Sequence, residues 1–191
     1  SASSRAIARI AQHPEDVLKL VNLARFEGKR ISQDTWHYIY RTAPQYPSEP
    51  SPKVVAEFSK ILSIPLRLGE LLRRLLELGV LEKIIPEFSH ARSLLQFNQY
   101  HKYTVDEHCI RTVEEATNFL ARQDTLGDVY RQLGDKTTLH LALLLHDLGK
   151  GFEEDHSEIG ARIARKVGEQ FGLPAEQSDT LAFLIHKHLR M

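Results

Sequence analysis

The sequence predicts an all-α fold. Apolar residues recur at spacings of three and four, as in Leu68, Leu71, Leu72, Leu75 and Leu76, and strict alternation of apolar and polar residues is scarce. The chain has 191 residues, of which 42% are hydrophobic and 26% charged, the balance of an ordinary globular protein. A chain of this length forms one main core, so we expect one helical domain that carries a helical extension.

Residues 1–92 are predicted to be the helical linker or extension. Pro14 in a first turn and Gly28 after a last turn are typical of helix ends. Four prolines within 43–52 cannot continue a helix and predict an extended connection there. The expected helices cover 5–11, 14–27, 53–63 and 65–78. The histidines of this part, at 13, 37 and 90, show no connection to a site.

Residues 93–191 form the second predicted part, which holds seven of the ten histidines. The segment 104–107 fits a capping box, so we expect a helix that begins at Thr104 and places His108 in or near its first turn. A helix over 135–147 is apolar nearly all round and is therefore expected at the centre, with Gly149 as its C-cap. Further helices are expected at 157–171 and from 174 to the end.

Composition narrows the possible partners. The chain has 25 Lys and Arg and 25 Asp and Glu, which argues against binding to long nucleic acids or anionic membranes. The longest apolar stretch, 139–145, is far shorter than a membrane span of about 20 residues, and the N-terminus lacks a signal-peptide pattern. One cysteine, Cys109, excludes an internal disulfide and a cysteine zinc cluster. We expect a cytoplasmic protein.

The adjacent pair His146-Asp147 is the most informative feature for function. Burying an imidazole and a carboxylate at the end of an apolar helix is costly unless each finds a partner, and a divalent cation would satisfy both. The alternative is a pair that backbone groups or water satisfy, and for an isolated dipeptide that alternative would be favoured. The surrounding motifs favour the metal.

These motifs are 104–108, 146–151 and 155–161, and their order resembles the HD superfamily of metal-dependent phosphohydrolases. The resemblance implies an HD-domain helical bundle that binds one or two divalent ions, with Mn, Fe, Zn and Mg left open. Its implied metal ligands are His108, His146 and Asp147, with His156 and His188 completing a second site. His186 and His188 lie about 200° apart on a helix, so both cannot easily face one ion, and we favour His188.

The resemblance also implies that Lys150 lines the site, where its ammonium group could contact a phosphate; the alternative is a solvated lysine. Asp147 and Lys150 are the candidate catalytic residues. His101, Arg111 and Lys150 are the candidate substrate-binding residues, Arg111 because it lies one turn from His108. His140 is expected to be structural or at the surface.

The segments 97–108, 145–151, 155–161 and 188–191, with 13–15 and 78–88 upstream, are similar to bifunctional PII uridylyltransferase/uridylyl-removing enzymes. That similarity implies hydrolysis of a phosphodiester, with a uridylylated PII-type signal protein as substrate, within a larger multidomain protein. The family's late Asp ligand would lie beyond Met191, so we expect an HD domain truncated at its C-terminus. The alternatives are a phosphohydrolase for a nucleotide or cyclic dinucleotide, and a noncatalytic regulatory module.

Overall fold

The structure, a computed structural model, describes residues 10, 13–95 and 103–188. Within them the fold is all α without any strand, as the sequence predicts. The α-helices are α2 (Pro14–Phe26), α3 (Gln33–Thr42), α4 (Pro52–Leu62), α5 (Leu68–Glu77), α6 (Leu81–Ile84), α7 (Phe88–Ala91), α8 (Val105–Asn118), α9 (Thr125–Gln132), α10 (Lys136–Leu145), α11 (His156–Gln170) and α12 (Ala175–Lys187). Two 3-10 helices are η1 (Ala43–Gln45) and η2 (Phe119–Ala121).

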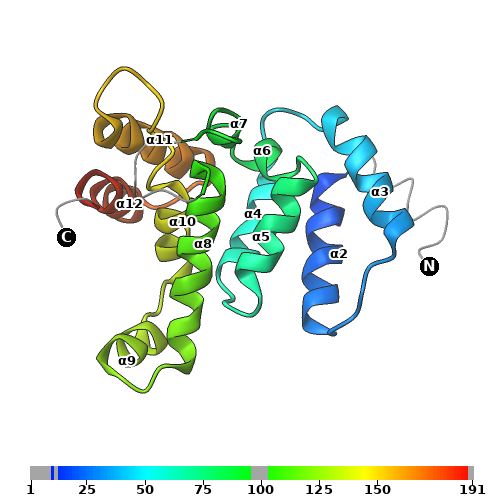
Figure 1. The fold of residues 1–191 in the computed structure, drawn as a ribbon, viewed down its shortest axis with the longest axis horizontal. Helices are drawn as coiled ribbons and strands as arrows, with labels where there is room; N and C mark the ends of the chain where they lie inside the picture. Colours follow the sequence, from blue (N-terminus) through cyan, green and yellow to red (C-terminus); the bar gives the residue numbers. More distant parts are fainter. Residues whose placement is uncertain (1–9, 11–12, 96–102, 189–191) are drawn as a thin grey trace.

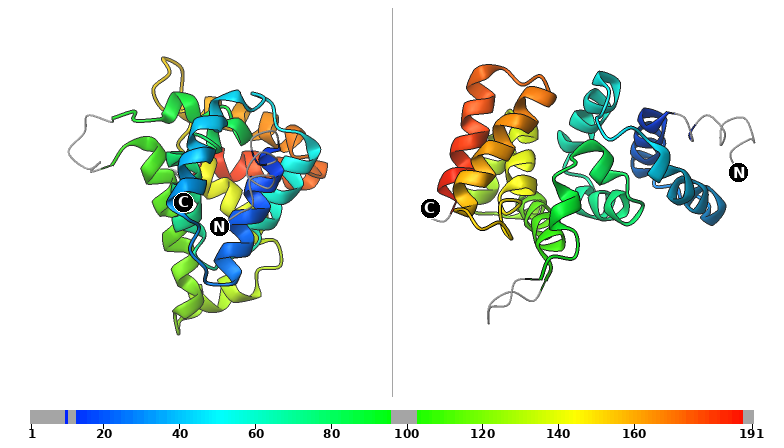
Figure 2. Two further views of the ribbon diagram at one scale, coloured as in Figure 1. Left: turned by 90° about the vertical axis from the view of Figure 1, so that its right-hand side faces the viewer. Right: turned by 90° about the horizontal axis from the view of Figure 1, so that it is seen from above.

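The helices follow one another along the long axis of the molecule (Figure 1). α2 and α3 lie at one end, α4 and α5 come next, and α8 and α10 lead to α11 and α12 at the other end, an order that the view from above also shows (Figure 2). A single cluster of buried apolar residues extends from Ile10 to Ile185. The predicted linker and the predicted second part therefore share one core.

Helix α10 is the central element of the second part. It packs against α4, α8, α11 and α12, and Leu141, Leu144 and Leu145 are fully buried. Asp135 caps its start by accepting a hydrogen bond from the Thr138 amide. The helix ends at Leu145 with His146 as its C-cap, so the expected cap at Gly149 is wrong.

Gly149 has a different role, because α11 passes directly over it. A Cβ atom at this position would lie 2.1 Å from the His156 carbonyl oxygen and 2.7 Å from the Gly160 nitrogen. Only glycine permits this approach, which keeps the loop after His146-Asp147 against the first turn of α11.

Arg73 of α5 joins the first part of the chain to the helix that carries His108. Its guanidinium donates to Glu107 and to Glu114 of α8, at 3.1 and 2.9 Å. Glu107 thus forms ion pairs with Arg73 and Arg111. The Thr104 side chain makes no capping hydrogen bond with the described residues. The expected helix start is correct, but the capping box that predicted it does not form.

The sequence pattern does not predict α3 or α9. The proline-rich segment 43–52 contains η1, ends at the first residue of α4 and is otherwise irregular, as expected for a connection. None of the described helices combines the length and the apolar character that crossing a lipid bilayer requires.

Candidate metal centre

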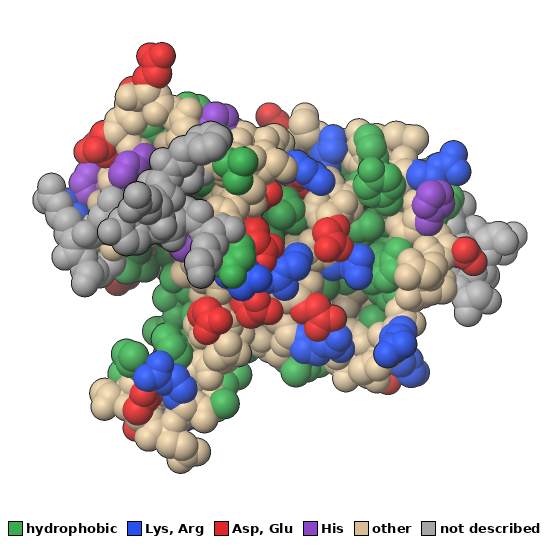
Figure 3. Space-filling model, viewed as in Figure 1, with side chains coloured by type: hydrophobic (Ala, Val, Ile, Leu, Met, Phe, Trp, Pro, Cys, Tyr) green, Lys and Arg blue, Asp and Glu red, His purple; other side chains and the backbone are tan. Residues whose placement is uncertain are grey.

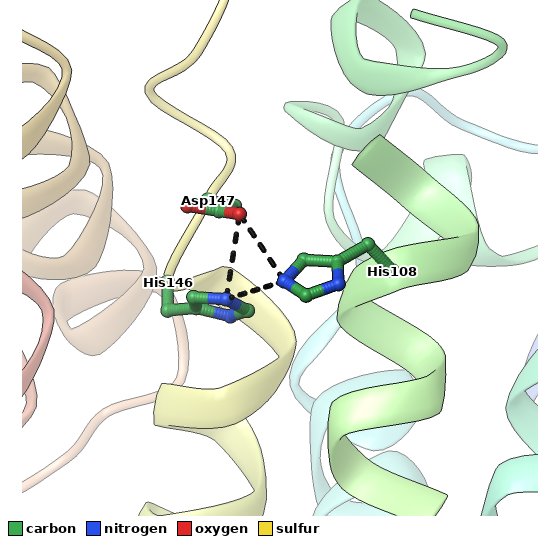
Figure 4. A group of neighbouring side chains, drawn as sticks. All are labelled: His108, His146 and Asp147. Carbon is green, nitrogen blue, oxygen red and sulfur yellow. Dashed lines mark hydrogen bonds and ion pairs between the residues drawn. The ribbon is translucent and has the colours of Figure 1, made fainter. Parts of the chain in front are cut away.

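Three side chains from α8 and from the end of α10 converge on one point (Figure 4). His108 Nε2 lies 3.2 Å from His146 Nε2, and Asp147 Oδ2 lies 3.4 Å from the first and 3.5 Å from the second. Asp147 is buried, His146 is largely buried and His108 is partly exposed. Among the described residues these three form the group suited to hold a metal ion.

The spacing of these three atoms fits a bound ion. Ligands held tetrahedrally at about 2.1 Å from a divalent ion lie about 3.4 Å from one another. The observed separations of 3.2, 3.4 and 3.5 Å agree with that value. Two imidazoles and one carboxylate also match the donors that zinc, iron and manganese accept.

His146 is held with one ring nitrogen turned toward the cluster. Its Nδ1 lies 2.7 Å from the Leu143 carbonyl oxygen, which can only accept, so Nδ1 carries the proton and Nε2 keeps its lone pair. Burial lowers the pKa of His146 more than the nearby Asp147 charge raises it. His146 is therefore a neutral imidazole at neutral pH, the form that binds a metal.

Asp147 remains a carboxylate despite its burial. Burial raises the pKa of Asp147, but its electrostatic interactions with His146 and Lys150, together with the hydrogen bond from Lys150, outweigh burial, so the net pKa is lowered. Lys150 Nζ lies 2.7 Å from Asp147 Oδ2, and only 12% of the lysine side chain is exposed. Lys150 thus lies beside the cluster, as the resemblance implies, and not in open solvent.

The second oxygen of Asp147 faces His188, and the ring of His156 lies next to that of His188. His188 Nε2, at the end of α12, lies 3.4 Å from Asp147 Oδ1, and its Nδ1 lies 2.6 Å from the Ile185 carbonyl oxygen. The His156 ring, in the first turn of α11, is centred 6.0 Å from the His188 ring. Asp147 Oδ1, His156 Nε2 and His188 Nε2 are buried without a hydrogen-bond partner among the described residues. Such orphaned polar atoms suit a second ion.

The remaining candidates lie elsewhere. Arg111 bonds Glu107 and stacks on Tyr103, so the structure does not bring it to the cluster. His186 lies 3.6 Å from Glu158, away from Asp147. His140 is buried and structural. The candidate at position 101 lies outside the described residues.

His90 is a residue whose link to this region the sequence does not reveal. Its ring stacks on Phe152 at 4.0 Å between centroids, two residues after Lys150. Gly151, with φ +87°, fits against it, since an added Cβ would lie 3.0 Å from His90 Nε2. Helix α7 of the first part therefore contacts the loop that carries Lys150. The glycine after Lys150 is the local signal that could have indicated this close contact.

The His-Asp pair at the end of α10 lies in a segment of the HD class. Residues 105–191 match the family model described as HD domain, and that segment is an HD domain. The chain is also similar to a bifunctional uridylyltransferase/uridylyl-removing enzyme of Cereibacter sphaeroides. The two are 46% identical over 125 residues, which are 63% of this chain and 13% of the relative. The chain thus matches only a small part of that protein's length.

Proposed function

We propose that the chain is the metal-dependent phosphohydrolase module of a uridylyl-removing enzyme, and that it hydrolyses the phosphodiester linking UMP to a PII-type signal protein. The observation that carries the proposal is the position of the Asp147 carboxylate between histidines on both of its sides. Its Oδ2 faces His108 and His146, and its Oδ1 faces His188. A carboxylate placed between two sets of imidazoles is suited to bridge two ions.

The proposed ligands of the first ion are His108, His146 and Asp147, and those of the second are Asp147, His156 and His188. The high share of imidazole favours Mn, Fe or Zn over Mg. A bound divalent ion would supply a Lewis acid for the phosphoryl group and lower the pKa of water for the attack.

The chain's own groups would orient and neutralise the substrate. Asp147 is kept ionised by Lys150 and offers both of its oxygens. The Lys150 ammonium can exchange its contact with Asp147 Oδ2 for a phosphoryl oxygen and so stabilise developing negative charge. Burial of these groups strengthens each interaction, because water screens it less.

Metal analysis combined with an assay of UMP release tests the proposal. We expect the wild-type chain to bind Mn, Fe or Zn and to release UMP from uridylylated PII protein. His146→Ala should lose bound metal and at least about 100-fold of the activity, since it removes a direct ligand. His37→Ala is the matched control, because His37 is an exposed histidine on α3, and it should behave as wild type.

Two outcomes would contradict the proposal. If no divalent metal binds to the wild-type chain, or if His146→Ala binds it equally well, the metal centre is wrong. If metal binds but only free nucleotides or cyclic dinucleotides are hydrolysed, the uridylyl-removing assignment is wrong. Metal binding without turnover of any of these substrates indicates a noncatalytic module.

A further inference from the structure

A large cavity within the described residues lies in the first part of the chain, away from the metal centre. It has a volume of about 670 Å³ and opens between α2, α3 and α5. That volume lies within the range of about 300–1,000 Å³ typical of small-molecule sites. The cavity shares no residue with the metal centre, so its ligand is a separate question.

Positive charge predominates in the walls of this cavity. Six of the lining residues are cationic, whereas two are acidic, in a chain with equal numbers of basic and acidic residues. The cationic residues are Arg25, Lys29, Arg30, Arg67, Arg73 and Arg74, and the acidic ones are Glu70 and Glu77. In Figure 3 part of this basic surface is visible near the lower end of α2.

The cations differ in how far carboxylates neutralise them. Arg67 pairs with Glu70 and Arg74 with Glu77. Lys29 is 77% exposed and its nearest carboxylate, that of Glu27, is 3.8 Å away. Arg30 is exposed and forms no ion pair with any residue that the structure describes. The loop between α2 and α3 therefore presents two cations that an anion could reach.

Arg25, beneath that loop, is a buried cation without an acidic partner. Only 6% of its surface is exposed, and its guanidinium donates to the carbonyl oxygens of Ile61 and Ile64 and to the Asn22 side chain, none of which carries a net charge. Its Nε has no hydrogen-bond partner among the described residues. Burial lowers the pKa of Arg25 to about 10. An anion in the cavity would offset this uncompensated charge.

Trp36 of α3 supplies a flat apolar wall. Its side chain is partly buried, and the Arg74 guanidinium lies 5.4 Å from the ring centroid. An indole beside several guanidinium groups can stack a planar base while the guanidinium groups bind phosphate oxygens. From these features we propose that the cavity binds a nucleoside polyphosphate, with Lys29 and Arg30 contacting the phosphates and Trp36 contacting the base.

Trp36 also provides the test, because it is the only tryptophan of the chain. UTP, ATP and inorganic tripolyphosphate are each titrated into the protein in EDTA, which keeps divalent ions from the metal centre, and tryptophan emission is corrected with free tryptophan. We expect a saturable change in tryptophan emission, and the affinity should fall as the salt concentration rises. The nucleotides should bind more tightly than tripolyphosphate, since only they can stack on the indole.

Charge reversal locates the site. Lys29→Glu and Arg30→Glu should each weaken binding at least about tenfold, because each replaces an attractive charge with a repulsive one. Lys53→Glu, an exposed change on α4 outside the cavity, should leave the affinity unchanged. Circular dichroism melts verify that all three variants fold.

The proposal is overturned if emission shows no saturable change up to millimolar ligand, or if the two loop variants bind as tightly as Lys53→Glu. It is also overturned if His146→Ala abolishes the signal, which would assign binding to the metal centre. Tripolyphosphate binding as tightly as the nucleotides would remove the role given to Trp36 and contradict the nucleoside part of the proposal.

Discussion

Two histidines on and next to α10 show how the partners of a side chain separate structure from chemistry. His140 has both ring nitrogens satisfied, Nδ1 by the Leu62 carbonyl oxygen and Nε2 by the Tyr130 hydroxyl. His146 has one nitrogen satisfied by a carbonyl, whereas its other nitrogen faces a second imidazole and a carboxylate. His140 therefore has no lone pair left to bind a metal ion, whereas His146 has one.

The state of His140 predicts a dependence of stability on pH. Burial lowers the pKa of His140 below that of an unfolded histidine, about 6.5. The unfolded chain therefore takes up the proton first as the pH falls. The neutral His140 contributes fully to stability above about pH 6.5, and this contribution is lost as the pH falls from there through the folded pKa. Urea midpoints at pH 7.5, 6.5 and 5.5, in EDTA, should fall more steeply for wild type than for His140→Gln. Parallel curves would show that His140 does not titrate on unfolding.

At the scale of the helix, and apart from the four-residue helices α6 and α7, the sequence predicts elements whose buried face is apolar and misses those whose buried face is not. Helices α8 and α10 bury continuous apolar stripes, and both were predictable. The buried side of α3 is Thr35, Ile39 and Thr42, and that of α9 is Gly127 and Tyr130. Such faces carry almost no hydrophobic periodicity, so a pattern search does not find them.

The same distinction applies to the candidate site. The HD pair is contiguous, and its position at a helix end could be predicted from the apolar run before it. The position of His188 beside Asp147 depends on how α12 packs, so the sequence could indicate it only through the resemblance. The stack of His90 on Phe152 depends on a tertiary contact between α7 and a loop, and the local sequence signals it only through Gly151, without indicating the partner.

The close packing of α5 on α8 predicts the effect of one methyl group. A Cβ at Gly69 would lie 2.5 Å from Glu114 Cβ, so Gly69→Ala must push the two helices apart and should destabilise the fold by about 1–3 kcal/mol. Gly134→Ala is the control, because nothing lies within 4 Å of a Cβ there. Urea unfolding at neutral pH measures both. Equal stability of the two variants would mean that the helices do not pack as described.

At the scale of the molecule, one core connects both predicted parts, whereas α9 projects from it (Figure 1). Leu126 and Val129 of α9 are about half exposed, so this projection buries little apolar surface of its own. The rest of the described chain should therefore unfold as one cooperative unit, and α9 should open more readily.

Cys109 reports on this cooperativity because it is the only cysteine and is fully buried in α8. Burial raises the pKa of its thiol, so the folded protein should react with a thiol reagent far more slowly than the urea-unfolded protein does. Labelling across a urea series should follow the loss of helical circular dichroism. Labelling complete well before that transition would indicate that α8 opens separately from the core.

The candidate metal centre joins parts of the chain that are distant in sequence. His108 and His146 are 38 residues apart, and His188 lies another helical hairpin further along. An isolated helix, or a peptide bearing the HD pair alone, holds at most a fraction of these donors. A cation that needs all of them finds them only in the native ensemble, so its binding free energy adds to the free energy of unfolding and grows with the logarithm of its free concentration.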